Sequence, residues 1–242
     1  MSEQQRSAAA AALRAVCPAL RTARHAARQR AGASELGYRI LTLAEPRRRR
    51  DQLVGDATKI VVEGFGGSGN TFAVAALRLL GVDVATVAHH HHVPAQVTAG
   101  LRRGLPTFVI VRRPEPAVAS LLRRDFVPSA AVGLRAYASF HERILPCASE
   151  LAVVTFEQLT AEPERVLASI ARAAGVEPRP DVDLADRDAV WRAARPGTRT
   201  EQAPERIARA EADRLIAAVP AGERRRAEDA RTALLDAAGA PV

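Results

Sequence analysis

The sequence predicts an α/β protein with a three-layer α/β/α arrangement, in which helices cover both faces of a central parallel sheet. Short β-branched runs alternate with helical segments between Lys59 and Gly175, which is typical of chains built from βαβ units. A glycine-rich turn joins the first predicted strand directly to a helix. The 242 residues, 48% hydrophobic and only 4% aromatic, suit one α/β domain with an aliphatic core and additional helices.

Three parts are expected along the chain: an N-terminal helical extension at 1–50, an α/β core at 51–181, and a C-terminal helical segment at 182–242 packed on the core. The predicted strands are Lys59–Glu63, Asp83–Ala88, Thr107–Arg112 and Leu151–Phe156. The predicted helices of the core are Thr71–Leu80, Pro94–Arg103, Pro114–Arg123, Ala130–Ala148 and Glu162–Ala174. Proline is tolerated in the first turn of a helix, and Gly175 ends the last one.

Outside the core the sequence is rich in arginine. Ser2 to Arg30 has a helical pattern rich in alanine and arginine, and Glu45-Pro46 interrupts the structure that follows. Arg47 to Arg50 form a run that is either a solvated patch or a patch serving the phosphate site or an acidic partner. Beyond Val176 the strand signals stop, and polar helices are expected.

Composition limits the classes of partner. A formal net charge of +8 favours anionic partners. We expect no nucleic acid among them, because the chain lacks a recognised motif and has few aromatic residues for base stacking. Cys17 and Cys147 lie far apart without zinc-ligand spacing, and no apolar run approaches the ~20 residues that span a bilayer. A cytoplasmic protein without a membrane span is therefore expected, with a monomer and a homodimer both left open.

The most informative segment is the glycine-rich turn Gly64 to Thr71, GFGGSGNT. A strand, a glycine loop and a helix in this order turn backbone N–H groups and a helix N-terminus toward phosphate. The turn nearly fits the GxxxxGK[ST] pattern of P-loops, but Asn70 stands in the place of the lysine. The alternative is a tight turn without a ligand. We expect an anion site on a P-loop NTPase-like fold that does not act in the standard NTPase way.

A second feature, besides Asn70, weakens an NTPase interpretation. An NTPase needs the loop lysine for the β- and γ-phosphates and an acid after a hydrophobic strand for Mg²⁺. Here the strand TFVIVRR ends in arginines. Glu157 follows the strand VVTF and could supply the acid, but its position suits a helix cap equally well.

Arg112 ends the third predicted strand, and Ser120 lies eight residues further, in the helix that follows. An arginine at the carboxyl end of a parallel strand lies beside the crevice where ligands of open sheets bind. A guanidinium grips a phosphate with two hydrogen bonds, and a serine hydroxyl can complete the site. Together with the glycine-rich turn, the pair predicts a ligand with two separated anionic groups.

Four consecutive histidines, His89 to His92, follow the second predicted strand. Successive residues of an extended segment alternate sides, so at most two of these side chains could face one metal ion. A purely structural role at the end of the sheet is a second interpretation. The third is a general base, because imidazole titrates near neutrality.

These segments, in this order, resemble the PAPS-dependent sulfotransferases, over roughly Lys59 to Val176 and most closely their bacterial members. GFGGSGNTF is similar to the family's 5′-phosphosulfate loop, and RRPEPAVAS to its 3′-phosphate motif, in which an arginine precedes a serine by eight positions. His92-Val93-Pro94 resembles the segment Lys-Thr-His-Leu-Pro that carries the catalytic base. TFEQLTAEPERVLASIARAAGV is similar to the stretch after the family's fourth strand.

The resemblance implies a sulfotransferase that moves a sulfuryl group from 3′-phosphoadenosine 5′-phosphosulfate to a hydroxyl or amine of a small or medium-sized acceptor, without a metal. It implies that the loop residues Gly66, Gly67, Ser68, Gly69, Asn70 and Thr71 hold the 5′-phosphosulfate. Arg112 and Ser120 would hold the 3′-phosphate, and His92 would act as the base, with His90 in the place of the family's lysine. Arg195 and Gly197 resemble the segment that closes over the nucleotide.

The chain departs from the family's pattern at two loop positions. Gly67 stands where the family carries lysine or arginine, and Asn70 replaces the first threonine. Arg113, Arg195 and Arg199 are candidates to supply the missing cation. Two alternatives therefore stand beside the sulfotransferase: a nucleotide-binding protein with impaired catalysis, and a Mg²⁺-dependent phosphotransferase.

Overall fold

The computed structural model describes residues 18–44, 51–186, 188, 190, 192 and 205–239. Its centre is a four-stranded parallel sheet in the order β2-β1-β3-β4, with β1 at Ile60–Gly64, β2 at Val87–His89, β3 at Thr107–Val111 and β4 at Ala152–Thr155. Every residue of β1, β2 and β3 is buried, as expected for a sheet covered on both faces. The predicted α/β class with a central parallel sheet is confirmed.

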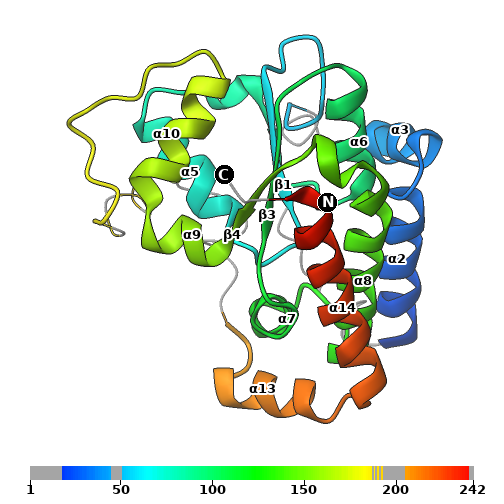
Figure 1. The fold of residues 1–242 in the computed structure, drawn as a ribbon. Coiled ribbons are helices and arrows are strands. Elements are labelled where there is room, and N and C mark those ends of the chain that lie inside the picture. The colour runs from blue at the N-terminus through cyan, green and yellow to red at the C-terminus, as the bar shows by residue number, and fades with distance from the viewer. Residues whose placement is uncertain are drawn as a thin grey trace, which may run out of the picture.

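Alternate side chains of the strands face two separate cores. In β3, Phe108 and Ile110 join the core formed with α5 (Asn70–Leu79), α9 (Phe156–Ala161) and α10 (Pro163–Ala173). Val109 and Val111 join the core on the opposite face, with α6 (Pro94–Arg102), α7 (Pro114–Arg123) and α8 (Ala130–Ile144). Figure 1 shows these two groups of helices on opposite sides of the sheet.

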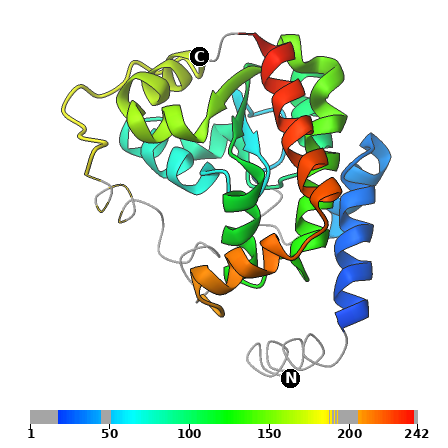
Figure 2. The ribbon, with the colours of Figure 1, turned by 60° about the horizontal axis from the view of Figure 1, so that its bottom comes forward.

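The C-terminal helices complete the second core. Helix α14 (Ala221–Ala238) lies alongside α8, as both ribbon views show, and buries Ala227 and Leu234 (Figures 1 and 2). Helix α13 (Arg209–Ala217) packs on α7. Two surface ion pairs join α14 to α8, Arg226 to Glu142 and Arg135 to Glu223, but exposed pairs of this kind contribute less than packing does.

Two helices precede the sheet in the described part of the chain. They are α2 (Pro18–Ala31) and α3 (Glu35–Ala44), which contact each other, and α3 also contacts α6. Tyr38 of α3 is buried against Val93 and Ala95. None of the helices within the described ranges is both long and apolar enough to cross a membrane.

Several predicted boundaries shift for identifiable local reasons. The second predicted strand begins late, because the Asp83 carboxylate accepts a hydrogen bond from the backbone N–H of Ala85 and starts the 3₁₀ turn η1 (Val84–Thr86). The long helix predicted to reach Ala148 ends at Ile144, where the 3₁₀ segment η2 (Leu145–Glu150) with its proline follows. Helix α9 was not predicted. Thr155 and Gln158 form a capping box that starts α9 at the point where β4 ends.

The order of the strands fixes where a ligand site is expected. From β1 the chain passes to β2 on one side, and it then crosses to β3 on the other side of β1. The strand order therefore reverses at β1, and open parallel sheets bind ligands at such a point, outside the carboxyl ends of the strands. The segments leaving β1, β2 and β3 there are the glycine loop (residues 64–70), the histidine run (residues 89–92) and Arg112-Arg113.

Candidate anion and general-base site

The glycine loop (residues 64–70) packs so closely on its surroundings that side chains are excluded at specific points. Gly67 has a φ of 84° and Gly69 a φ of 105°, in the left-handed region that favours glycine. A Cβ atom added to Gly67 would lie 2.5 Å from the backbone oxygen of Ala117 in α7. No room therefore exists for a basic side chain at position 67, so the departure from the sulfotransferase pattern is built into the loop.

The loop ends in the N-terminus of a ten-residue helix, α5. Its N-cap is Gly69, which has no side chain to accept hydrogen bonds from the first turn. Ser68 is fully buried, and its Oγ has no hydrogen-bond partner among the described residues. A helix N-terminus without a side-chain cap, a helix dipole and an unpartnered hydroxyl are features that suit an anion.

The next two side chains turn toward the histidine run (residues 89–92). Asn70 is buried, and its Nδ2 lies 3.4 Å from Nδ1 of His92, while its Oδ1 is buried without a partner among the described residues. Thr71 Oγ1 lies 3.1 Å from Nε2 of His90. The Asn70 amide thus contacts an imidazole, although the resemblance implied that it holds the phosphosulfate; the structure brings the glycine loop and the histidines into one site.

Arg112 lies against the glycine loop. Its Nη1 donates a hydrogen bond of 2.9 Å to the backbone oxygen of Gly67, and its guanidinium carbon lies 4.0 Å from the centre of the Phe156 ring. Tyr137 donates a hydrogen bond to the Arg112 carbonyl from the opposite side. Burial lowers the pKa of the half-buried guanidinium, which the nearby Glu157 carboxylate partly offsets. The result is a fixed cation beside the loop.

Ser120 does not share a hydrogen bond with Arg112 in the described part of the chain. Its Oγ instead accepts a hydrogen bond of 2.8 Å from Nη1 of Arg124, one turn further along α7. Leu121 of the same helix would contact a Cβ atom placed on Gly66, so this part of α7 lies along the loop. The predicted arginine–serine pair is thus extended by a second arginine, Arg124, at the C-terminal cap of α7.

The four histidines alternate in burial. His89 and His91 are buried, whereas His90 and His92 are half-exposed. Burial lowers the pKa of His89 to about 4 against the opposing effect of Glu63, so this imidazole is neutral at pH 7. The φ angles of His90 (61°) and His92 (54°) are left-handed, which is unfavourable for residues with a Cβ atom.

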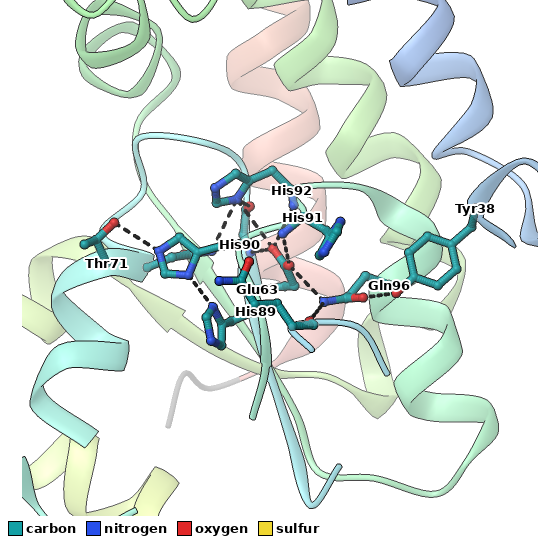
Figure 3. A network of polar contacts seen from close by, with 11 residues as sticks. Tyr38, Glu63, Thr71, His89, His90, His91, His92 and Gln96 are labelled. Atoms are coloured by element: carbon teal, nitrogen blue, oxygen red, sulfur yellow. Dashed lines mark hydrogen bonds and ion pairs between the residues drawn. The ribbon is translucent and has the colours of Figure 1, made fainter. Parts of the chain in front are cut away.

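Glu63, the fourth residue of β1, is the centre of the site (Figure 3). Its carboxylate is fully buried and accepts hydrogen bonds from the backbone N–H groups of His91 (2.7 Å) and His92 (3.1 Å). Burial alone would raise the pKa of this carboxyl group. The hydrogen bond and charge of His92, with contributions from His91, outweigh burial and hold the pKa below its ordinary value.

Gln96 of α6 connects Glu63 to the N-terminal helices. Its Nε2 donates to the backbone oxygen of Gln52 (2.8 Å) and to Oε1 of Glu63 (3.4 Å). Its Oε1 accepts a hydrogen bond from the Tyr38 hydroxyl of α3. Figure 3 shows this row of side chains running from Tyr38 to the histidine run.

The proton of the neutral His92 imidazole is assigned by its partners. Nδ1 lies 2.8 Å from the backbone oxygen of Gly64 and 3.5 Å from Oε2 of Glu63. Both oxygens only accept hydrogen bonds, and the Gly64 contact is much shorter than the 3.4 Å contact between Nδ1 and the amide nitrogen of Asn70, so Nδ1 carries the proton and Nε2 carries the lone pair. His92 is therefore the member of the run that is prepared to accept a proton at Nε2.

The structure thus unites the glycine loop, Arg112, His90 and His92. Ser120 lies on the adjacent helix with Arg124, and Arg113 is exposed. Arg195, Gly197 and Arg199 lie outside the described residues. Sequence reasoning overlooked Glu63, although a glutamate in an otherwise apolar strand was a visible signal.

Two results complete the description of the site. Among the residues that the structure describes, no three His, Cys, Asp or Glu side chains are grouped so that they could hold a metal ion. No protein-family model matches the chain, and no curated protein or solved structure is detectably similar to it. Function is therefore inferred from the residues of the site.

Proposed function

We propose that this protein is a cytoplasmic sulfotransferase that moves a sulfuryl group from 3′-phosphoadenosine 5′-phosphosulfate to a hydroxyl or amine, on a P-loop NTPase-like fold. The observation that carries the proposal is the meeting of three groups at the point where the strand order reverses. These are the glycine loop, Arg112 hydrogen-bonded to it, and His92 with its lone pair on Nε2. The acceptor is a small or medium-sized molecule.

The donor supplies a sulfuryl group already activated as a phosphosulfate anhydride. Backbone N–H groups of the loop and the first turn of α5, with the Ser68 hydroxyl, would hold its 5′-phosphosulfate. Arg112, Ser120 and Arg124 supply the cations and hydroxyl for its 3′-phosphate. An orphaned buried hydroxyl and an uncapped helix favour this assignment, while the existing Ser120–Arg124 hydrogen bond requires that the two residues bind as a unit.

His92 performs the proton transfer. As the acceptor oxygen or nitrogen attacks sulfur, its bond to hydrogen breaks and the proton passes to Nε2 of His92. The bond from sulfur to the bridging oxygen breaks, and adenosine 3′,5′-bisphosphate leaves with that electron pair. The charge that develops on the bridging oxygen needs a donor other than position 67. Arg112, which is hydrogen-bonded to Gly67, and His90, which contacts Thr71, are the candidates.

One observation favours a second function. Gly67 leaves no space for the basic residue that the family places on the leaving phosphate. A nucleotide-binding protein with impaired catalysis would have the same loop, the same Arg112 and affinity without turnover.

Thermal stabilisation by nucleotides tests the proposal. Adenosine 3′,5′-bisphosphate at 100 times its Kd is expected to add about 2.7 kcal/mol of stability, which is about 5–10 °C in Tm for a chain of this size. ADP with Mg²⁺ is the comparison. A preference for ADP with Mg²⁺ would contradict the sulfotransferase proposal and favour a phosphotransferase. Stabilisation by neither nucleotide would mean that the glycine loop is a structural turn. Turnover of the sulfated donor separates the enzyme from the binding protein.

Arg112→Ala is expected to weaken binding of adenosine 3′,5′-bisphosphate by at least about tenfold, because a hydrogen bond to a charged group contributes about 1.5–3 kcal/mol. AMP lacks the 3′-phosphate, so its affinity should change much less in a calorimetric titration. Arg143→Ala removes an exposed guanidinium in the last turn of α8 and serves as the matched control. Equal losses for both nucleotides would mean that Arg112 only supports the loop through Gly67 and Phe156.

A further inference from the structure

We infer that Glu63 is the positioning residue of His92, and that its buried carboxylate sets both the direction and the tautomer of the imidazole. The inference rests on the proposed function only for the step in which His92 accepts a proton. The direction and the tautomer of the His92 imidazole are properties of the folded protein and can be measured without a substrate.

The surroundings of Glu63 require an acceptor and exclude a donor. Oε1 faces the backbone N–H of His91 and the amide nitrogen of Gln96. Oε2 faces the backbone N–H groups of His92 (3.1 Å) and Gly64 (3.2 Å). An ionised carboxylate accepts at both oxygens, whereas an amide in the same place would aim its own N–H groups at one of these donors. The site is therefore specific for the charged acid.

The backbone that Glu63 holds is unfavourable by itself. His90 and His92 both have left-handed φ angles, and His91 between them points its buried side chain toward Tyr38. Such conformations persist where the surroundings hold them in place. The carboxylate binds two successive N–H groups of this turn, so the direction of the His92 side chain depends on it.

The tautomer of His92 follows from the same contacts. Free imidazole side chains favour the proton on Nε2, whereas here Nδ1 meets the Gly64 carbonyl and the Glu63 carboxylate. These two acceptors move the proton to Nδ1 and direct the lone pair of Nε2 away from them. Gln96, itself fixed by Tyr38 and Gln52, orients the other carboxylate oxygen.

Nitrogen-15 NMR of the histidine side chains in the full chain tests the inference, at a pH where the imidazoles are neutral. Wild-type His92 is expected to show a protonated Nδ1 and an unprotonated Nε2. Glu63→Gln is expected to shift His92 toward a mixture of tautomers. Glu164→Gln makes the same chemical change on the exposed face of α10 and should leave His92 unaltered. A wild-type His92 protonated on Nε2, or a Glu63→Gln spectrum identical to wild type, would overturn the inference.

A second set of measurements separates this inference from the proposed function. The Kd of adenosine 3′,5′-bisphosphate should be the same within about twofold for wild type and Glu63→Gln, since the Glu63 carboxylate is fully buried beneath the histidine run. The kcat of Glu63→Gln should fall at least about tenfold, because a misoriented base loses part of its contribution to catalysis. If wild type fails to bind the bisphosphate but shows the Nδ1 proton, the proposed function fails and the inference stands. If Glu63→Gln does not fold, Glu63→Asp is the second variant. It keeps the negative charge but moves the carboxylate back by one methylene, and it must still alter the nitrogen-15 spectrum of His92.

Discussion

Replacing His92 with alanine is expected to lower sulfuryl transfer by about 10²–10⁴-fold, the usual contribution of a positioned general base. The Nδ1 side of the ring is tied to Gly64 and Glu63, so the lone pair of Nε2 is directed away from these two acceptors and is lost with the ring. Affinity for adenosine 3′,5′-bisphosphate should stay within about threefold, because a general base acts mainly in the transition state. The measurement is kcat together with the Kd of the bisphosphate.

His25→Gln provides the control, because His25 lies on α2 and away from the site. It should retain wild-type turnover. If His92→Ala keeps its activity while His90→Ala loses it, the base is the histidine that contacts Thr71. If both variants remain active, the acceptor reacts without a protein base, and the role assigned to the histidine run is wrong.

Gly67→Ala is expected to lower the free energy of unfolding by about 3 kcal/mol. A left-handed backbone costs a residue with a Cβ atom about 1–2 kcal/mol, and overpacking adds about 1–3 kcal/mol. The overpacking arises because the new methyl group would lie 2.5 Å from the Ala117 carbonyl. Urea denaturation followed by circular dichroism gives the difference.

Gly104→Ala isolates the backbone effect from the steric one. Gly104 has a φ of 66°, but a Cβ atom there would meet no atom within 4 Å. Its substitution should therefore lower stability by only about 1 kcal/mol. Similar losses for the two variants would show that the loop can move away from Ala117, and a lysine at position 67 would then become a practical way to restore the family's cation.

The fold was predictable where local patterns decide it. Helix Pro114–Arg123 is found at its predicted bounds, and the first strand and its helix are displaced by one residue. The β-branched run, the glycines and the proline at the start of a helix are local signals, and each is decided within a few residues. Helix Glu35–Ala44 was predicted only as part of the helical extension at 1–50 and without bounds, since its buried residue Tyr38 packs on residues more than fifty positions away.

The site was predictable in its residue types and less so in its contacts. The eight-residue spacing placed Arg112 and Ser120 near the loop, but their actual partners are Gly67 and Arg124. The alternate burial of the histidines is not that of an extended chain, because β2 ends at His89 and both His90 and His92 have left-handed φ angles. Glu63 was conspicuous as an acid in an apolar strand, but its contacts could not be deduced, because His91, His92 and Gln96, 28 to 33 residues away, are brought to it by the pairing of β1 with β2 and by the packing of α6.

The hydrogen bond from Tyr38 to Gln96 alters how the chain should be divided for engineering. A boundary drawn near residue 50 separates an apparent helical appendage from the part of the protein that carries the candidate site, yet Tyr38 lies on one side of that line and the amide that contacts Glu63 lies on the other. Trimming or exchanging the appendage would therefore change the surroundings of His92 through Gln96 and Glu63. A chimaeric protein joined near residue 50 must therefore take Tyr38 and Gln96 from the same parent.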